Sequence, residues 1–196
     1  MNTRPLLAGC VAGVVALAGG ASVTCAQSAQ PFSVQASLLA TQSEAKFGAP
    51  IGKVKFTGFG VELQGRYTWV SPWSLGVGLQ VTAGSEASGV NELLVGGFVE
   101  PRFSFDVGSD RFAPYAAARV GYLKDIFTVS GFSGDISSNV LAYGIGGGLL
   151  VRMSKIVNID VGAAVTNNDA SGSSLGNYSF VGFVVKAGVS VGFGTR

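Results

Sequence analysis

Eight charged side chains lie within stretches that are otherwise rich in apolar and small residues, and they are the residues best placed to do chemistry. They are Glu62, Arg66, Glu100, Arg102, Arg119, Arg152, Asp160 and Lys186. Paired carboxylates can act as general acid and base where a cleft admits a substrate. Carboxylates beside guanidinium or ammonium groups can instead form buried ion pairs. Whether these charges act in catalysis or form buried ion pairs depends on the secondary structure that positions them.

Composition excludes several other chemistries. The chain of 196 residues contains no His, which rules out His-dependent triads, His metal sites and His proton shuttles. Its two cysteines are Cys10 and Cys25, so we expect a mature chain without a disulfide or a Cys-metal site. The net charge is only +2, so nucleic acid is not an expected partner. We therefore expect no enzyme activity, no cofactor and no metal site.

The N-terminal segment 1–26 is typical of a cleavable secretory signal. A positive charge precedes an apolar stretch over 6–23, and the small residues 24–26 resemble a signal cleavage site. We expect this signal peptide to be followed by one folded domain over 27–196. The alternatives are an uncleaved membrane anchor and lipidation at Cys10, which ends a short lipoprotein-like box.

The rest of the chain alternates apolar with polar or small residues, the pattern of strands that have two different faces. Each stretch has about 10–14 residues, the length that a tilted strand needs to cross a bilayer. All eight charges fall on the polar faces. Pro101 lies inside the fourth stretch, where it marks a bulge or an early strand end. The stretches span about 32–41, 59–70, 74–84, 92–105, 113–123, 140–153, 156–166 and 180–193.

The connections between these stretches are alternately long and short. Long loops on one side and short turns on the other are typical of outer-membrane barrels. The sequence therefore predicts an all-β fold, an eight-stranded antiparallel up-and-down transmembrane β-barrel with its apolar face towards lipid. The long connections are 42–58, 85–91, 124–139 and 167–177, and the short ones are 71–73, 106–112 and 154–155.

Two segments carry a family resemblance. FAPYAAARVGY at 112–122 and the strand-turn-strand at 143–165 resemble the small eight-stranded outer-membrane barrels, the group of the outer membrane protein A transmembrane domain and the opacity-type adhesins. The resemblance implies a monomeric, porin-like barrel in the outer membrane of a Gram-negative bacterium. It also implies that Phe193 is the terminal aromatic read by the barrel assembly machinery, although Gly-Thr-Arg follows it.

The polar faces of the strands are expected to point into the barrel. We expect the eight charges to form a lumen network that plugs it, with Glu100 near Arg119 and Asp160 near Lys186. The expected function is a structural outer-membrane protein whose loops support envelope integrity or surface adhesion. One alternative is a narrow or gated pore. Another is a soluble, lipocalin-like barrel that binds lipid and turns its apolar face inward.

The loops are the expected contact surfaces for a surface ligand. In 42–58, Lys46, Lys53 and Lys55 are candidates for contact with lipopolysaccharide phosphates, or belong to an ordinary solvated loop. In 124–139, several apolar residues indicate a contact surface or a hairpin that extends the barrel wall.

Overall fold

The computed structural model describes residues 30–46, 53–86, 90–129, 136–171 and 178–194, and the predicted signal segment 1–26 lies outside them. Among the described residues, no helix is long and apolar enough to cross a membrane. The strands are Phe32–Lys46 (β1), Lys53–Val70 (β2), Trp73–Ser85 (β3), Val90–Ser104 (β4), Phe112–Val129 (β5), Ile136–Arg152 (β6), Val157–Ser171 (β7) and Tyr178–Phe193 (β8).

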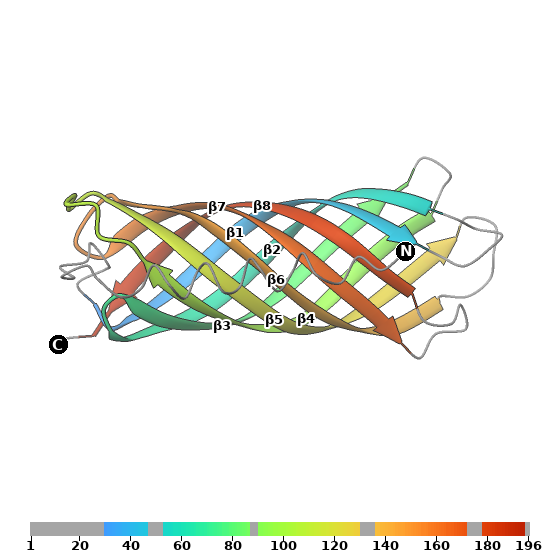
Figure 1. The fold of residues 1–196 in the computed structure, drawn as a ribbon, viewed down its shortest axis with the longest axis horizontal. Coiled ribbons are helices and arrows are strands. Elements are labelled where there is room, and N and C mark those ends of the chain that lie inside the picture. Colours follow the sequence, from blue (N-terminus) through green and yellow to red (C-terminus); the bar gives the residue numbers. More distant parts are fainter. Residues whose placement is uncertain (1–29, 47–52, 87–89, 130–135, 172–177, 195–196) are drawn as a thin grey trace, which may run out of the picture.

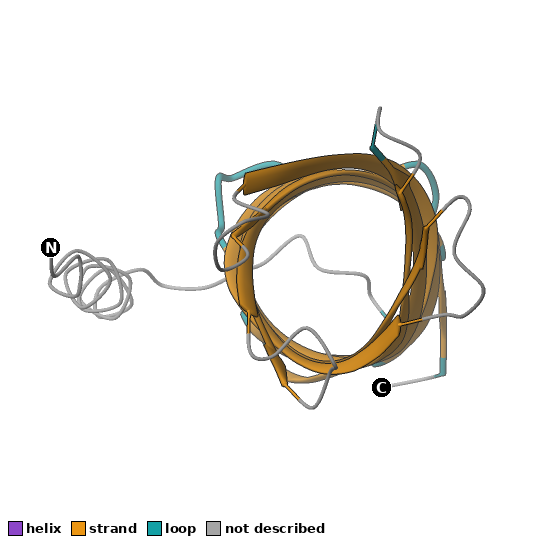
Figure 2. Cartoon of the chain, turned by 90° about the vertical axis from the view of Figure 1, so that its right-hand side faces the viewer, coloured by secondary structure: helices purple, strands orange, loops and turns teal. Residues whose placement is uncertain are grey.

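Each strand pairs antiparallel with its neighbour in sequence, and β8 pairs with β1, so the sheet closes on itself (Figure 1). Figure 2 looks along the ring that results. The predicted all-β, eight-stranded antiparallel barrel is therefore confirmed.

The apolar face of the strands lies on the outside of the barrel. On β2 the side chains of Phe59 and Leu63 are 73% and 58% exposed, while the polar Glu62 beside Leu63 is buried. Water would not tolerate such a surface around a whole barrel, but lipid does. The alternative of a soluble barrel with its apolar face inward is therefore wrong.

The apolar outer band has the height of a bilayer core. On β2 it runs from Phe59 to Trp69. At about 3.3 Å per residue and a strand tilt of about 40°, this span covers about 25 Å, the height expected for such bands. Aromatic rings gather at its turn-side edge, where Phe193 stacks on Phe32 with ring centroids 6.0 Å apart. The role of Phe193 as an assembly signal stays a prediction.

The strands are longer than predicted, and much of 42–58 and 124–139 is barrel wall rather than loop. β2 begins at Lys53 and β5 ends at Val129. In this extension Phe56 points inward and is buried, whereas Lys55 is exposed on the outside. The reason is a change of outer solvent: beyond the band the wall faces water, so the two faces of each strand exchange character.

Pro101 neither creates a bulge nor ends its strand. β4 continues to Ser104, and its pairing with β5 keeps one register from Val99–Val120 to Arg102–Ala117. Only Glu100 and Pro101 are skipped in that ladder, because a proline has no N–H to donate. On its other side Pro101 pairs with Leu75 of β3.

We expect Leu63→Arg, in the middle of the lipid-facing band, to lower the free energy of unfolding by about 2–4 kcal/mol, because the charge would face hydrocarbon. The matched control is Thr57→Arg, on the same outer face of β2 but beyond the band, where the cost is at most about 1 kcal/mol. Urea unfolding in lipid vesicles measures both values. Equal losses would contradict the position of the band.

Candidate functional site in the barrel lumen

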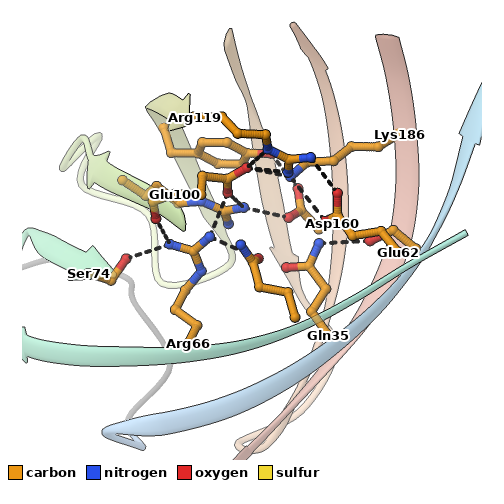
Figure 3. A network of polar contacts seen from close by, with 12 residues as sticks. Gln35, Glu62, Arg66, Ser74, Glu100, Arg119, Asp160 and Lys186 are labelled. Carbon is orange, nitrogen blue, oxygen red and sulfur yellow. Dashed lines mark hydrogen bonds and ion pairs between the residues drawn. The ribbon is translucent and has the colours of Figure 1, made fainter. Parts of the chain in front are cut away.

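Glu100 of β4 is the centre of a buried ion-pair network in the lumen (Figure 3). One carboxylate oxygen accepts from Arg66 Nη2 at 2.6 Å and from Arg102 Nη2 at 3.0 Å. The other oxygen accepts from Arg119 and lies 3.5 Å from Lys186 Nζ. A single carboxylate thus contacts four cations, which are carried by β2, β4, β5 and β8.

Two further carboxylates complete the network. Asp160 of β7 lies 3.0 Å from Arg102 Nη2 and accepts a 2.7 Å hydrogen bond from the Tyr115 hydroxyl. Glu62 of β2 lies 2.7 Å from Arg119 Nη1. The network therefore joins three acidic and four basic side chains, and its formal charge is close to neutral.

Of the two predicted ion pairs, the structure contains one. Glu100 contacts Arg119 as the strand order suggested. Lys186 pairs with Glu62 and Glu100, at 3.9 and 3.5 Å, rather than with Asp160. Asp160 is instead bound by Arg102, which reaches it across the lumen.

Aromatic rings support two of the guanidinium groups. Arg102 Cζ lies 3.7 Å from the ring centroid of Tyr115, and Arg119 Cζ lies 3.8 Å from that of Phe98. Neither ring had a predicted role, although both share the inward parity of the charges. Glycine makes room for them, since a Cβ at Gly148 would collide with the Tyr115 hydroxyl.

Polar side chains without charge also take part, and sequence reasoning gave them no role in the network. Arg66 donates to Gln64 at 2.9 Å and to Ser74 at 3.1 Å. Arg119 donates to Gln80 at 3.2 Å. The alternation pattern could have identified all three, because even-numbered residues of β2 and β3 face the lumen. No group of His, Cys, Asp or Glu that could hold a metal ion is found in the described part of the chain.

Arg152 is the predicted lumen charge that the structure places elsewhere. It is the last residue of β6 and is only partly buried. Because the strand ends there, its side chain lies at the barrel mouth and lines an open hollow together with Arg111 and Lys155. The other seven predicted charges meet in the network.

The predicted lysines of 42–58 lie on the outer wall of the extension. Lys53 is bound to Glu44 at 2.9 Å and is largely exposed. Lys55 is also exposed on the same face of β2. The side chain of Lys46 lies outside the described residues.

A small chamber separates the ion-pair network from the loop-side end of the lumen. Its volume is about 90 Å³, room for several water molecules at roughly 10–15 Å³ each. Arg119 and Lys186 line it from the network, and Leu94, Leu123 and Phe180 line it from the opposite side.

An apolar cap lies in the lumen above the chamber. Its rings come from β2, β5 and β8: Phe56 lies 5.7 Å from Phe127, and Phe127 lies 6.0 Å from Tyr178. The hypothesis of a hairpin that extends the barrel wall fits 124–129 and 136–139, with Phe127 turned inward rather than offered to a partner. The buried members of the cap are Ala45, Phe56, Leu123, Phe127, Val140, Ala142, Ala170, Tyr178 and Phe180.

Two carboxyl groups are buried beside this cap, beyond the membrane band, whose edge on β5 is marked by the exposed Lys124. Asp125 accepts a 2.8 Å hydrogen bond from the Tyr178 hydroxyl, and its other oxygen has no partner among the described residues. Burial raises the pKa of Asp125 to about 6. Burial and then the nearby Asp125 charge raise the pKa of Glu92 to about 8. Asp125 was missed because its predicted strand ended at 123, whereas Glu92 was the first residue of its predicted strand and was given no role.

Comparison with solved structures identifies the architecture. Neisserial surface protein A has a TM-score of 0.65 and 20% identity, over 83% of this chain and 97% of that one. The fold is that of the small outer-membrane β-barrels. The outer membrane protein OprG from Pseudomonas aeruginosa is also similar, with a TM-score of 0.49 and 13% identity over 85% of this chain and 98% of that one. Ail, the attachment invasion locus protein of Yersinia pestis, has a TM-score of 0.49 and 20% identity over 81% of this chain and 97% of that one. No protein-family model matches the sequence, and no curated protein matches it.

In this outer-membrane barrel we expect Glu100→Gln to lower the free energy of unfolding by about 3–5 kcal/mol, because three buried cations and the partly buried Arg119 lose a shared counter-charge. The control is Glu44→Gln, which removes the partly buried partner of the exposed Lys53 and costs at most about 1 kcal/mol. Urea unfolding followed by heat-modifiable gel mobility measures both. A loss for Glu100→Gln no larger than that of the control would contradict its central position.

The outer-membrane barrel should also become less stable as pH rises. The folded state keeps a proton on Glu92 that the unfolded chain releases, so stability falls between the ordinary pKa of 4.5 and about 8. One such group contributes at most about 1.4 kcal/mol per pH unit. Glu92→Gln should flatten this fall and leave the smaller one due to Asp125, which ends near pH 6. Unfolding midpoints across this range check it, and parallel curves for the two proteins would refute it.

Proposed function

We propose that this protein is a structural component of the outer membrane, with a lumen closed to solutes and an extended wall that faces the medium. The supporting observation is that two different layers fill the lumen. The network around Glu100 fills its lower part, and the cap around Phe127 fills its upper part. Ions and small solutes would have to displace both layers to cross.

The extension is the part of this barrel that can meet the cell's surroundings. Its outer face is polar, and Lys53 and Lys55 stand just above the apolar band that begins at Phe59. Phosphates of lipopolysaccharide lie at that level, and lysine binds phosphate as a point charge. We therefore assign to these two lysines the contact with lipopolysaccharide that anchors the barrel's outer edge.

A gated pore is the second candidate, and the chamber favours it. The contacts of Lys186 are the longest ion pairs of the network, at 3.5 and 3.9 Å, and the chamber next to it gives its side chain room to move. Displacement of Lys186 alone would still leave the apolar cap in the path.

Planar-bilayer conductance tests the closed lumen. Because the two layers block in series, we expect no steady channels from the unmodified protein, from Arg119→Ala or from Phe127→Ala. The combined variant, with both layers weakened, should conduct. Heat-modifiable mobility shows that each variant is folded. Steady channels from the unmodified protein would instead establish the pore, and steady channels from Arg119→Ala alone would contradict the block by the apolar cap.

A further inference from the structure

A basic hollow lies at the turn-side end of the barrel, away from the lumen network and the outer lysines. It is formed where the turn after β4 meets the turn between β6 and β7. Three cations and one carboxylate face it, so its formal charge is positive. The residues that line it are Asp110, Arg111, Arg152, Met153, Ser154 and Lys155.

Backbone hydrogen bonds hold the two walls of the hollow together. Arg152 N donates to Arg111 O at 2.8 Å, directly beside the first β5–β6 pair, Phe112 with Val151. This bond places the two arginines next to each other although they are far apart in sequence. Adjacent guanidinium groups can grip a phosphate through parallel hydrogen bonds, which single lysines cannot do.

The wall carrying Lys155 is also well defined. Met153 N donates to Val157 O at 3.0 Å, and Ser154 Oγ accepts from Val157 N at 3.1 Å. The tight turn keeps Lys155 close to Arg152. The third cation therefore reaches the hollow from a fixed backbone, which lowers the entropy cost of binding an anion.

The hollow adjoins the lipid-facing band. Met153 and Ile156 are apolar and exposed beside the cations, and Phe112 and Phe105 are exposed at the same end of the barrel. A ligand bound there can place a phosphate among the basic groups and its apolar part along the band. A free phosphate would use only half of this surface, whereas basic pockets at a membrane edge suit lipid headgroups.

We propose that this hollow binds the phosphate headgroup of an anionic phospholipid in the periplasmic leaflet of the membrane. The proposal rests on the orientation adopted for the proposed function, with the short turns in the periplasm. Arg111 and Arg152 bind the phosphate oxygens, and Lys155 supplies the third positive charge. The negative charge of Asp110 repels the phosphate and so lowers the affinity for the lipid.

Native mass spectrometry of the full barrel, released from neutral-detergent micelles, tests this site. Phosphatidylglycerol or phosphatidylethanolamine is added at equal mole fraction, and retained lipid is counted. We expect the unmodified protein to retain phosphatidylglycerol preferentially. The variant Arg111→Gln/Arg152→Gln/Lys155→Gln should lose at least about tenfold in apparent affinity, and Asp110→Asn should gain affinity.

The matched control is Lys53→Gln/Lys55→Gln/Lys124→Gln, which removes the same charge from the opposite end. This control should still bind phosphatidylglycerol but no longer bind lipopolysaccharide. The Arg111 triple variant should still bind lipopolysaccharide but no longer bind phosphatidylglycerol. Unchanged phosphatidylglycerol binding in the Arg111 triple variant, or equal loss in both triples, would overturn the lipid site. Competition by millimolar inorganic phosphate would overturn the choice of a lipid. Lipopolysaccharide binding that survives the control triple would count only against the proposed role of the outer lysines.

Discussion

The mutual pairing of three acidic and four basic side chains inside a lumen of eight strands is the constraint on which the rest of the barrel depends. Lipid outside forces every polar side chain inward, and a barrel of this size has no room for bulk water around them. Each charge must therefore find its partner across the lumen. Glu100 meets this condition for four cations at once, and Arg102 extends the same network to Asp160. The contacts of Arg102 with Asp160 and of Arg119 with Glu62 join strands that are not neighbours in the sheet, so they brace the barrel across its interior.

A second constraint acts along the strands, because the solvent outside the wall changes from lipid to water. Within the band the outer face is apolar and the lumen is polar. In the extension Lys55 faces outward and Phe56 inward, so the arrangement is that of a water-soluble barrel with an apolar core. The lumen thereby contains two kinds of packing in series, one ionic and one apolar. The chamber lies where one packing mode gives way to the other.

The sequence predicts which face of each strand turns inward, because side-chain direction follows parity and needs no distant partner. It does not predict which inward charges meet. Arg102 reaches Asp160, 58 residues away, and such reach depends on lumen width and on rings such as Phe98 that fill it. Strand ends were also misjudged, since alternation continues past the band with its polarity exchanged. That error hid Asp125, which lies beyond the predicted end of its strand at 123.

The buried charges also define the faces that hold the strands in register. β8 has an unbroken apolar outer face from Val181 to Phe193, and over the same range its inner face consists of glycine and Val184 except for the polar Lys186 and Ser190. If those two were apolar, both faces would tolerate lipid, and a slip by one residue would cost little. Well-packed apolar residues could match the stability of the ion pairs. They could not mark one face as the inside. Lys186 does so, because a one-residue slip would place its ammonium in hydrocarbon and leave Glu62 and Glu100 without it.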